Sequence, residues 1–391
     1  MKKCLLILPR PIFPQICGYA IKNYSLLNVL SKKFKIKLIV ITNFELSAEE
    51  LKYYDEKCDE YVVWKIPKWK SLLNTFLALF KNEPLQVAYY YDNKLQKRVI
   101  DMSNECDLLI SSLVRTRKYF NCIENKDKRI IFDMVDSISL NYEASAEETK
   151  SNFWKIIYSV ESKRLKEFEK QSIKNSNVTF LFNPDEKAYW DSAGNVVWLP
   201  HGTDEKLFYY DRTIPELEKS VVFLGKMDYQ PNIDAVLWYL KNVHPFLPQD
   251  LKFVIVGAYP TKEIVKESSR FTNVIVTGYV DDPYIYANSC MAMVAPMFTG
   301  GGIQNKVLEG MALGKINIVS TKTAKAIKNL VVGKEVLVAD TPSEYIENIL
   351  DIYLNGNEDK YKFIERSARE FIMENFTWVK YGEQYCNALE K

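Results

Sequence analysis

Residues 294–314 read Val-Ala-Pro-Met-Phe-Thr-Gly-Gly-Gly-Ile-Gln-Asn-Lys-Val-Leu-Glu-Gly-Met-Ala-Leu-Gly. A short apolar segment runs into three glycines, Gly300, Gly301 and Gly302. A helical pattern follows at once, with Lys306 and Glu309 three residues apart. A flexible loop before a helix N-terminus predicts an anion site, because free backbone N–H groups and the helix dipole both favour negative charge. Lys306 adds a positive charge, and Glu309 suits the hydroxyl groups of a ribose, so the segment predicts a nucleotide site.

This segment has a simpler interpretation, in which the glycines only let the loop turn and Lys306 and Glu309 form a surface ion pair. Three successive glycines cost backbone entropy, which favours close approach of a ligand or of another backbone. The apolar stripe of the helix indicates that Lys306 and Glu309 lie on another face; that stripe consists of Ile303, Val307, Leu308 and Met311. Ile303 and Gln304 complete the predicted donor loop.

Short apolar runs alternate with helical patterns along the whole chain. Strands are predicted at 5–8, 37–41, 61–64, 108–111, 130–132, 178–181 and 196–199, and again at 221–225, 253–257, 274–277, 291–295, 316–320 and 336–339. Helices are predicted between them at 19–31, 94–103, 153–174, 231–243, 261–267, 303–313 and 342–354. Such alternation predicts two α/β units with doubly wound parallel sheets. The polar stretch 204–220 is the expected linker, and 355–391 is helical with a break near residue 375.

The domains expected from this pattern are 1–203, 204–372 and a last helix at 373–391. Two domains fit the length of 391 residues, since single cores stop growing near ~250–300 residues. Ligands of doubly wound domains bind outside the carboxyl ends of the strands, so the glycine loop is expected to open on a cleft between the domains.

Composition narrows the function classes. The net charge of +2 gives no reason to expect a nucleic-acid partner. Seven scattered cysteines fit a reduced, cytoplasmic compartment. Only His201 and His244 are histidines, which nearly excludes a histidine-based metal site. The apolar run at 4–8 is too short for a signal peptide or a membrane span.

Two further segments carry possible donor contacts. Lys226 follows the strand 221–225 and could meet the same diphosphate as Lys306, or it could be a solvated lysine beside a helix start at Pro231. Gly278 ends a strand, and Tyr279 and Val280 after it could present backbone groups and an apolar surface to a base. The simpler alternative is an ordinary turn with Asp281 or Asp282 as helix N-cap.

These three segments, in this order, resemble retaining glycosyltransferases of the GT-B fold, in particular glycosyltransferase family 4. Residues 302–312, Gly-Ile-Gln-Asn-Lys-Val-Leu-Glu-Gly-Met-Ala, are similar to the exopolysaccharide sugar-transferase branch, as are residues 225–234. Pro200-His-Gly-Thr-Asp resembles the family's domain crossover, and Phe376-Thr-Trp resembles the start of its last helix. The resemblance is close from about residue 195 and holds only in outline before it.

The resemblance implies that Lys226 and Lys306 stabilise the leaving diphosphate and that Glu309 holds the ribose. The family often has a glutamate eight residues before Glu309, where this chain has Gly301. The family's second basic residue falls near Pro231 and Asn232, so Lys306 is expected to supply that charge. Many members also place a histidine of the N-terminal domain near the reacting sugar. Here only His201, at the crossover, comes near that position, so this role stays open.

Candidates in the N-terminal half follow predicted strands. Gly18 resembles the family's glycine loop that faces the donor phosphates, although it could be a loop glycine without a ligand. Arg115 could meet phosphate or the acceptor. Asp136 could receive or orient the acceptor hydroxyl, or it could be a structural N-cap.

Residues 65–81 contain four lysines, no acid and a dense apolar face. That composition suits a helix at an anionic lipid surface. It equally suits a domain helix whose apolar face packs inward.

We therefore expect a retaining, metal-independent enzyme that moves a sugar from a UDP- or GDP-sugar to a glycan or lipid-linked acceptor in surface polysaccharide synthesis, without a cofactor. The expected location is cytoplasmic, with peripheral contact at the inner face of the plasma membrane left open. Two alternatives remain, a nucleotide-sugar 2-epimerase of the same fold and a catalytically silent partner subunit. The sugar, the base, the acceptor and the linkage are not encoded in any motif.

Overall fold

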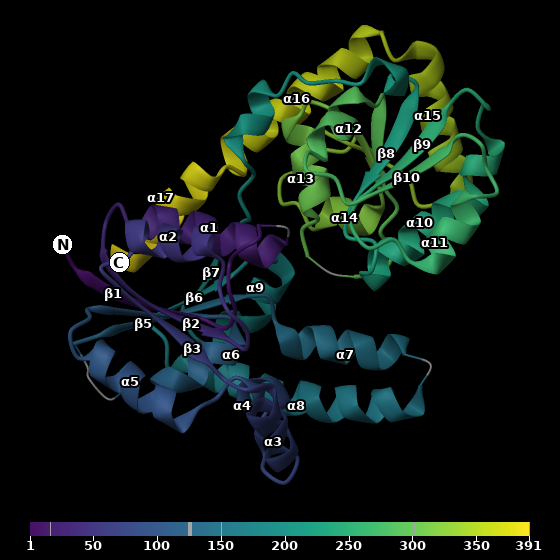
Figure 1. Ribbon diagram of the computed structural model, residues 1–391. Helices are drawn as coiled ribbons and strands as arrows, with labels where there is room; N and C mark the ends of the chain where they lie inside the picture. Colours follow the sequence, from purple (N-terminus) through teal and green to yellow (C-terminus); the bar gives the residue numbers. More distant parts are fainter. Residues whose placement is uncertain (16, 124–126, 150, 301, 391) are drawn as a thin grey trace. The chain divides into compact units, whose positions relative to one another are not determined.

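The computed structural model describes residues 1–15, 17–123, 127–149, 151–300 and 302–390. It divides into two units (Figure 1). Unit 1 is Met1–Pro200 together with the chain from Tyr381 onward, and unit 2 is His201–Lys380.

Unit 1 is built on a parallel sheet whose described strands follow the order β3 (Glu60–Lys65), β2 (Lys35–Thr42), β1 (Lys3–Leu8), β4 (Leu108–Ser112), β5 (Arg129–Val135), β6 (Val178–Leu181) and β7 (Val196–Trp198). The helices of this unit are α1 (Gly18–Leu30), α2 (Ala48–Lys57), α3 (Lys68–Ala78), α4 (Leu85–Tyr89), α5 (Asn93–Ser103), α6 (Val114–Arg117), α7 (Ile138–Glu148), α8 (Asn152–Lys174) and α9 (Pro184–Trp190). The central strand β1 is buried from Cys4 to Leu8 because a parallel sheet is covered on both faces. Figure 1 shows α7 and α8 side by side as a long helical hairpin.

Unit 2 repeats the plan with the strand order β10 (Val274–Gly278), β9 (Lys252–Val256), β8 (Ser220–Leu224), β11 (Ala292–Ala295), β12 (Ile316–Val319) and β13 (Leu337–Val338). Its helices are α10 (Gln230–Asn242), α11 (Lys262–Ser268), α12 (Tyr284–Ser289), α13 (Asn305–Ala312), α14 (Thr321–Lys325), α15 (Pro342–Asn355) and α16 (Asp359–Asn375). The last helix, α17 (Trp378–Glu390), begins in unit 2 and ends in unit 1.

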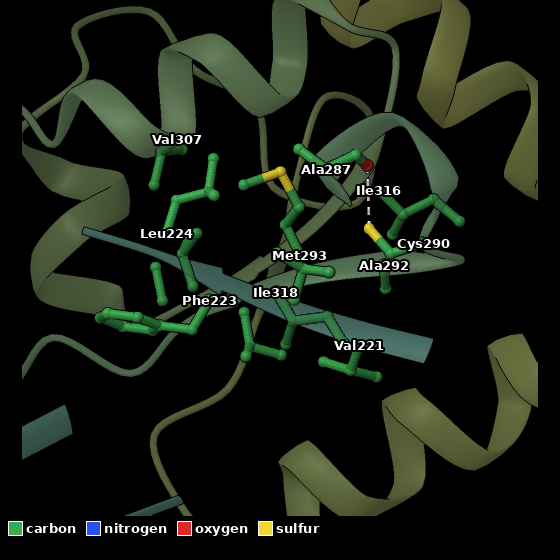
Figure 2. Packing of buried hydrophobic residues seen from close by; sticks show 14 of the residues in the cluster. Val221, Phe223, Leu224, Ala287, Cys290, Ala292, Met293, Val307, Ile316 and Ile318 are labelled. Atoms are coloured by element: carbon green, nitrogen blue, oxygen red, sulfur yellow. Dashed lines mark hydrogen bonds between the residues drawn. The ribbon is translucent and has the colours of Figure 1, made fainter. Parts of the chain in front are cut away.

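The core of unit 2 lies between its sheet and the helices that cover it. Figure 2 shows side chains of β8, β11, β12 and α13 packed together, among them Phe223, Met293, Val307 and Ile318. Burial of these apolar side chains stabilises the sheet, and it fixes the start of α13 against the end of β8. The residues that follow β8 and those that open α13 are therefore held close to one another.

The predicted architecture of two doubly wound α/β units is confirmed, and each predicted strand and helix overlaps one in the structure. The break near residue 375 is the junction of α16 and α17. Two details differ. Helix α13 begins at Asn305 rather than at Ile303. The stretch expected to be a linker, 204–220, packs on unit 2 because Leu207, Phe208 and Leu217 are buried in its core.

Candidate active site

Lys306 lies in the first turn of α13 and is buried. Its ammonium group donates a hydrogen bond of 2.5 Å to Asn232 Oδ1 and lies 4.1 Å from the centre of the Phe223 ring. The expectation that it lies away from the buried face of its helix is wrong, since only 8% of the residue is exposed. Burial lowers the pKa of Lys306 to about 7, against a smaller opposing effect of the Glu309 carboxylate. An anion bound beside this ammonium group would favour its charged form.

Asn232 links Lys306 to the loop after β8. While its Oδ1 accepts from Lys306, its Nδ2 donates a hydrogen bond of 2.9 Å to the backbone carbonyl oxygen of Lys226. Asn232 is 5% exposed, so both bonds are shielded from water. The amide therefore fixes the position of the buried ammonium relative to the backbone that carries the second lysine.

Lys226 itself is exposed at the carboxyl end of β8. Its ammonium group lies 3.0 Å from Asp228 Oδ2 and 5.3 Å from the centre of the Tyr259 ring. Exposed ion pairs of this kind contribute little stability, so this side chain can exchange Asp228 for a ligand phosphate at small cost.

Glu309 is half-buried on α13, one turn after Lys306. The Tyr284 hydroxyl donates a hydrogen bond of 3.3 Å to Glu309 Oε1. Burial raises the pKa of Glu309 to about 7, although Tyr284 and Lys306 act in the opposite direction. Because Lys306 is buried, the alternative that this pair is a surface ion pair is wrong. The pKa values of Lys306 and Glu309 are instead both about 7.

The glycine loop packs on the first turn of α10. Gly300 and Gly302 have φ values of 80° and 75°, a left-handed conformation that glycine adopts without strain. A Cβ atom at Gly300 would lie 3.1 Å from Pro231 Cγ, so this position also needs glycine for space. Gly301 lies outside the described residues. Ile303 packs partly on the core, and Gln304 is the N-cap residue of α13.

The loop after β10 contains Tyr279 and Val280, the two predicted donor contacts, and exposes only one of them to solvent. Tyr279 is 64% exposed, whereas Val280 packs partly against the core of unit 2. The alternative with Asp281 or Asp282 as the helix N-cap is wrong, because Pro283 holds that position. Asp282 Oδ2 instead accepts hydrogen bonds of 2.6 Å from the Tyr210 hydroxyl and 2.5 Å from Arg212.

In unit 1, the residue after β4 and the last residue of β5 have strained backbones. Leu113 and Val135 have φ values of 62° and 70°, and neither is glycine. Such residues cost about 1–3 kcal/mol each and concentrate at functional sites. Leu113 precedes α6, which carries Arg115, and Val135 precedes Asp136. The strain thus occurs where the chain turns to present two of the predicted site residues.

Asp136 is half-buried, and burial raises its pKa to about 6. The alternative that it caps a helix is wrong, because Ser137 is the N-cap residue of α7. Glu186 accepts a hydrogen bond of 2.7 Å from the Ser137 backbone N–H, and burial together with Asp136 raises the pKa of Glu186 to about 8. Burial raises the pKa of Glu169 to about 7. Asp136 is therefore the carboxyl group of the three that ionises first as the pH rises.

The carboxyl ends of β1 and β4 carry the other unit 1 candidates. Gly18 is the first residue of α1, and the Arg10 guanidinium lies 4.2 Å from the centre of the neighbouring Tyr19 ring. Arg115 Nε donates a hydrogen bond of 2.9 Å to Gln86 Oε1, and its guanidinium lies 5.4 Å from the centre of the Tyr90 ring.

A pocket of about 160 Å³ opens at the same edge of the sheet. Its lining includes Arg10, Phe44, Ser71, Tyr89 and Tyr90. One guanidinium beside aromatic rings suits a ligand that joins an anionic group to a sugar or an apolar chain. Arg115 does not line this pocket, but its guanidinium adjoins the Tyr90 ring that does.

His201 and His244 do not belong to a cluster of potential metal ligands among the described residues. Among the described residues, no group of three or more His, Cys, Asp or Glu side chains could hold a metal ion. The His201 ring packs 4.7 Å from the Trp378 ring, between centres, and its Nδ1 lies 2.7 Å from the Gly202 carbonyl oxygen. His244 is buried with Nε2 3.0 Å from Asn273 Oδ1.

Comparison with known proteins finds a family that matches the part of unit 2 containing Lys226 and the glycine loop. Residues 218–355 match the family "Glycosyl transferases group 1". The chain carries a group 1 glycosyltransferase domain. This segment contains Lys226, Asn232, Lys306 and Glu309. The resemblance drawn from the motifs is confirmed at this level, and so is the GT-B fold.

Relatives extend the comparison over both units. An uncharacterized 44.6 kDa protein in the cps region of Klebsiella pneumoniae is 26% identical over 92% of this chain and 94% of its own length. Sucrose-phosphate synthase of Thermosynechococcus elongatus has a similar structure, with a TM-score of 0.71, 15% identity and coverage of 100% and 98%. HepE of Anabaena in complex with UDP gives a TM-score of 0.69, 11% identity and 100% coverage of both chains.

Several residues of this site were not predicted from the sequence. Asn232 and Tyr284 act through hydrogen bonds to Lys306 and Glu309, and an ordinary asparagine or tyrosine in a helix gives no signal of that. Glu169 and Glu186 join Asp136 only through the fold, because they lie on α8 and α9.

Proposed function

We propose that this glycosyltransferase transfers a sugar from a UDP- or GDP-sugar to a glycan or lipid-linked acceptor during synthesis of a surface polysaccharide, with retention at the anomeric carbon. The observation that carries the donor half is the buried Lys306–Asn232 contact beside the glycine loop and Lys226. The HepE complexes with UDP and with UDP-glucose support a nucleotide-sugar donor. The relative in a cps region supports the polysaccharide role.

In this proposal the diphosphate lies against the backbone N–H groups at the start of α13. Lys306 and Lys226 stabilise the negative charge that develops on the leaving diphosphate, an interaction that grows in the transition state and so accelerates transfer. Glu309, once ionised, accepts hydrogen bonds from the ribose hydroxyls. Tyr284 keeps that carboxylate oriented.

The acceptor half of the proposal rests on unit 1. Asp136, with a pKa of about 6, is ionised at neutral pH and can accept the hydrogen of an acceptor hydroxyl. Arg10 and Arg115, at the same sheet edge, can bind an anionic group of the acceptor. We assign no metal to the reaction, so activity should persist in EDTA.

The test uses Glu309→Gln, with Glu347→Gln on α15 as a matched control. Purified enzyme is incubated with a panel of UDP- and GDP-sugars and a lipid or glycan extract, and the released nucleoside diphosphate is measured. We expect acceptor-dependent release, reduced about 100-fold or more in Glu309→Gln and unchanged in Glu347→Gln. Unchanged release in Glu309→Gln would overturn the assignment. An epimerised sugar formed from donor alone would indicate the epimerase instead.

A further inference from the structure

Helix α3 exposes its apolar face and turns its small and polar side chains toward the rest of unit 1. The face it buries carries Ser71 and Ala78, with Asn74 Nδ2 donating a hydrogen bond of 2.8 Å to the Tyr91 carbonyl oxygen. The exposed apolar side chains of α3 and the two residues after it are Trp69, Leu72, Leu73, Phe76, Leu77, Leu79 and Phe80, and all but Leu79 share one helical spacing. The alternative that this apolar face packs inward is therefore wrong.

The exposed positions follow the spacing of one helix face. Residues 69, 72, 73, 76, 77 and 80 recur at intervals of three and four, which makes a continuous stripe. Trp69 is 67% exposed, Phe76 56% and Phe80 77%. Exposure of such a stripe to water is costly, and it marks a surface that contacts a protein partner or a membrane.

A second row of exposed apolar side chains lies on α8. Arg164 Nη2 donates a hydrogen bond of 3.2 Å to the Leu79 carbonyl oxygen, which places the end of α3 beside α8. Val160 lies one turn before Arg164, and Ile156 and Phe153 lie earlier in α8 on the same face. All three side chains are exposed. We call the stripe on α3 and these three residues together the apolar surface.

Lysines border this surface, and ion pairs neutralise the carboxylates close to α3. Lys68 and Lys81 flank α3 and Lys155 lies among the exposed residues of α8; all three are exposed. Three carboxylates near α3 are paired, Asp92 with Lys70, Glu83 with Lys118 and Glu161 with Arg164. The border of the apolar surface along α3 is thus positive.

We propose that the apolar surface docks unit 1 onto a bilayer that contains anionic lipid. Apolar side chains would enter the region between headgroups and acyl chains, and the lysines would meet lipid phosphates. Tryptophan suits that interface because its ring is apolar and carries one N–H donor, and phenylalanine and leucine supply the apolar face. A second copy of the chain fits less well, because a symmetric dimer would bring the lysines of both copies together.

Helix α3 also lines the unit 1 pocket described above. Ser71, on the face of α3 opposite the apolar stripe, lines the pocket that contains Arg10 and Tyr90. Docking would therefore hold that pocket next to the lipid headgroups. The docking itself does not depend on the proposed transfer chemistry.

Co-sedimentation of the full chain with vesicles tests the proposal. The vesicles are phosphatidylcholine alone or phosphatidylcholine with phosphatidylglycerol. The variants are Leu72→Ser/Phe76→Ser and Lys68→Glu/Lys81→Glu. The control is Leu354→Ser/Lys241→Glu, which changes an exposed leucine and an exposed lysine of unit 2.

We expect the wild-type protein and the control to sediment with anionic vesicles, less so at high salt, and each α3 variant to bind about tenfold or more weakly. Unchanged circular dichroism spectra and thermal unfolding midpoints of the α3 variants show that they are folded. No sedimentation of the wild-type protein, or equal sedimentation of the α3 variants, would overturn the proposal. So would a dimer that ignores vesicles and that Leu72→Ser/Phe76→Ser converts to a monomer. Failure of sugar transfer would leave the docking result standing.

Discussion

The buried ammonium group of Lys306 donates a hydrogen bond of 2.5 Å to Asn232 Oδ1. Through its Nδ2, the same asparagine holds the Lys226 carbonyl oxygen at 2.9 Å. A lysine inside a protein is costly unless something compensates its charge, and here the hydrogen-bonding partners are neutral: the Asn232 amide and, at 3.6 Å, the Met297 sulfur. The arrangement leaves the charge of Lys306 to be satisfied by an anion.

Asn232→Ala tests the role of this amide. It removes the acceptor of the Lys306 ammonium and the donor to the Lys226 carbonyl, and a buried hydrogen bond to a charged group is worth about 1.5–3 kcal/mol. We expect UDP or GDP affinity, measured by calorimetry, to fall about 10- to 100-fold. Asn242→Ala, at the other end of α10, removes a bond to the Trp238 carbonyl oxygen and should not change affinity. Equal affinity in both variants would exclude a positioning role.

Lys306→Met separates function from stability. Replacing a buried charged group with an apolar one of similar size is often neutral or stabilising. We expect the thermal unfolding midpoint to change by no more than about 3 °C, while sugar transfer falls about 100-fold or more. A large drop in the midpoint with transfer preserved would mean that Lys306 is a structural residue.

Nucleotide binding should depend on pH in two directions. A bound diphosphate favours the charged form of Lys306, whose pKa is about 7, so binding takes up a proton and weakens as the pH rises above 7. A bound ribose favours ionised Glu309, also near 7, so binding releases a proton and weakens as the pH falls below 7. Affinity should therefore peak near pH 7.

Substitutions at Lys306 and at Glu309 should each abolish one side of this pH profile, either the fall in affinity above pH 7 or the fall below it. Affinity of Lys306→Met should rise with pH and then level, and affinity of Glu309→Gln should fall with pH. Calorimetry in buffers of different ionisation enthalpy measures the protons exchanged. A flat profile for the wild-type protein from pH 6 to pH 8 would contradict both assignments.

Asp136→Asn should affect transfer without affecting donor binding, because Asp136 belongs to unit 1. We expect the rate of transfer to fall about 10²- to 10⁴-fold at unchanged UDP or GDP affinity. The wild-type rate should rise with pH through about 6 as the carboxyl group ionises. Asp185→Asn, an exposed residue in the first turn of α9, is the control. Loss of donor affinity in Asp136→Asn would move this residue out of its proposed role.

The sequence predicted the framework of both units well, because alternating apolar runs and helical periods specify parallel sheets. It also predicted the strand-end positions of Lys226, Arg115 and Asp136. It did not predict that Lys306 is buried, since that depends on Asn232 and Phe223, which lie more than 70 residues away in the chain. Hydrogen-bond partners of this kind follow from packing and leave no periodic pattern.

Helix α3 shows the opposite limit. The sequence shows an amphipathic pattern in this helix, but the pattern does not determine which face packs against the rest of unit 1. The contacts of Asn74 and Ser71 with unit 1 decide that, and they turn the apolar face outward.

The most direct test of the central claim is a calorimetric titration of UDP and of GDP into the wild-type protein, Lys306→Met and Asn242→Ala. The account predicts saturable binding of one nucleotide by the wild-type protein and by Asn242→Ala, and about 100-fold weaker binding by Lys306→Met. Folded wild-type protein that binds neither nucleotide would contradict it and would favour a catalytically silent subunit.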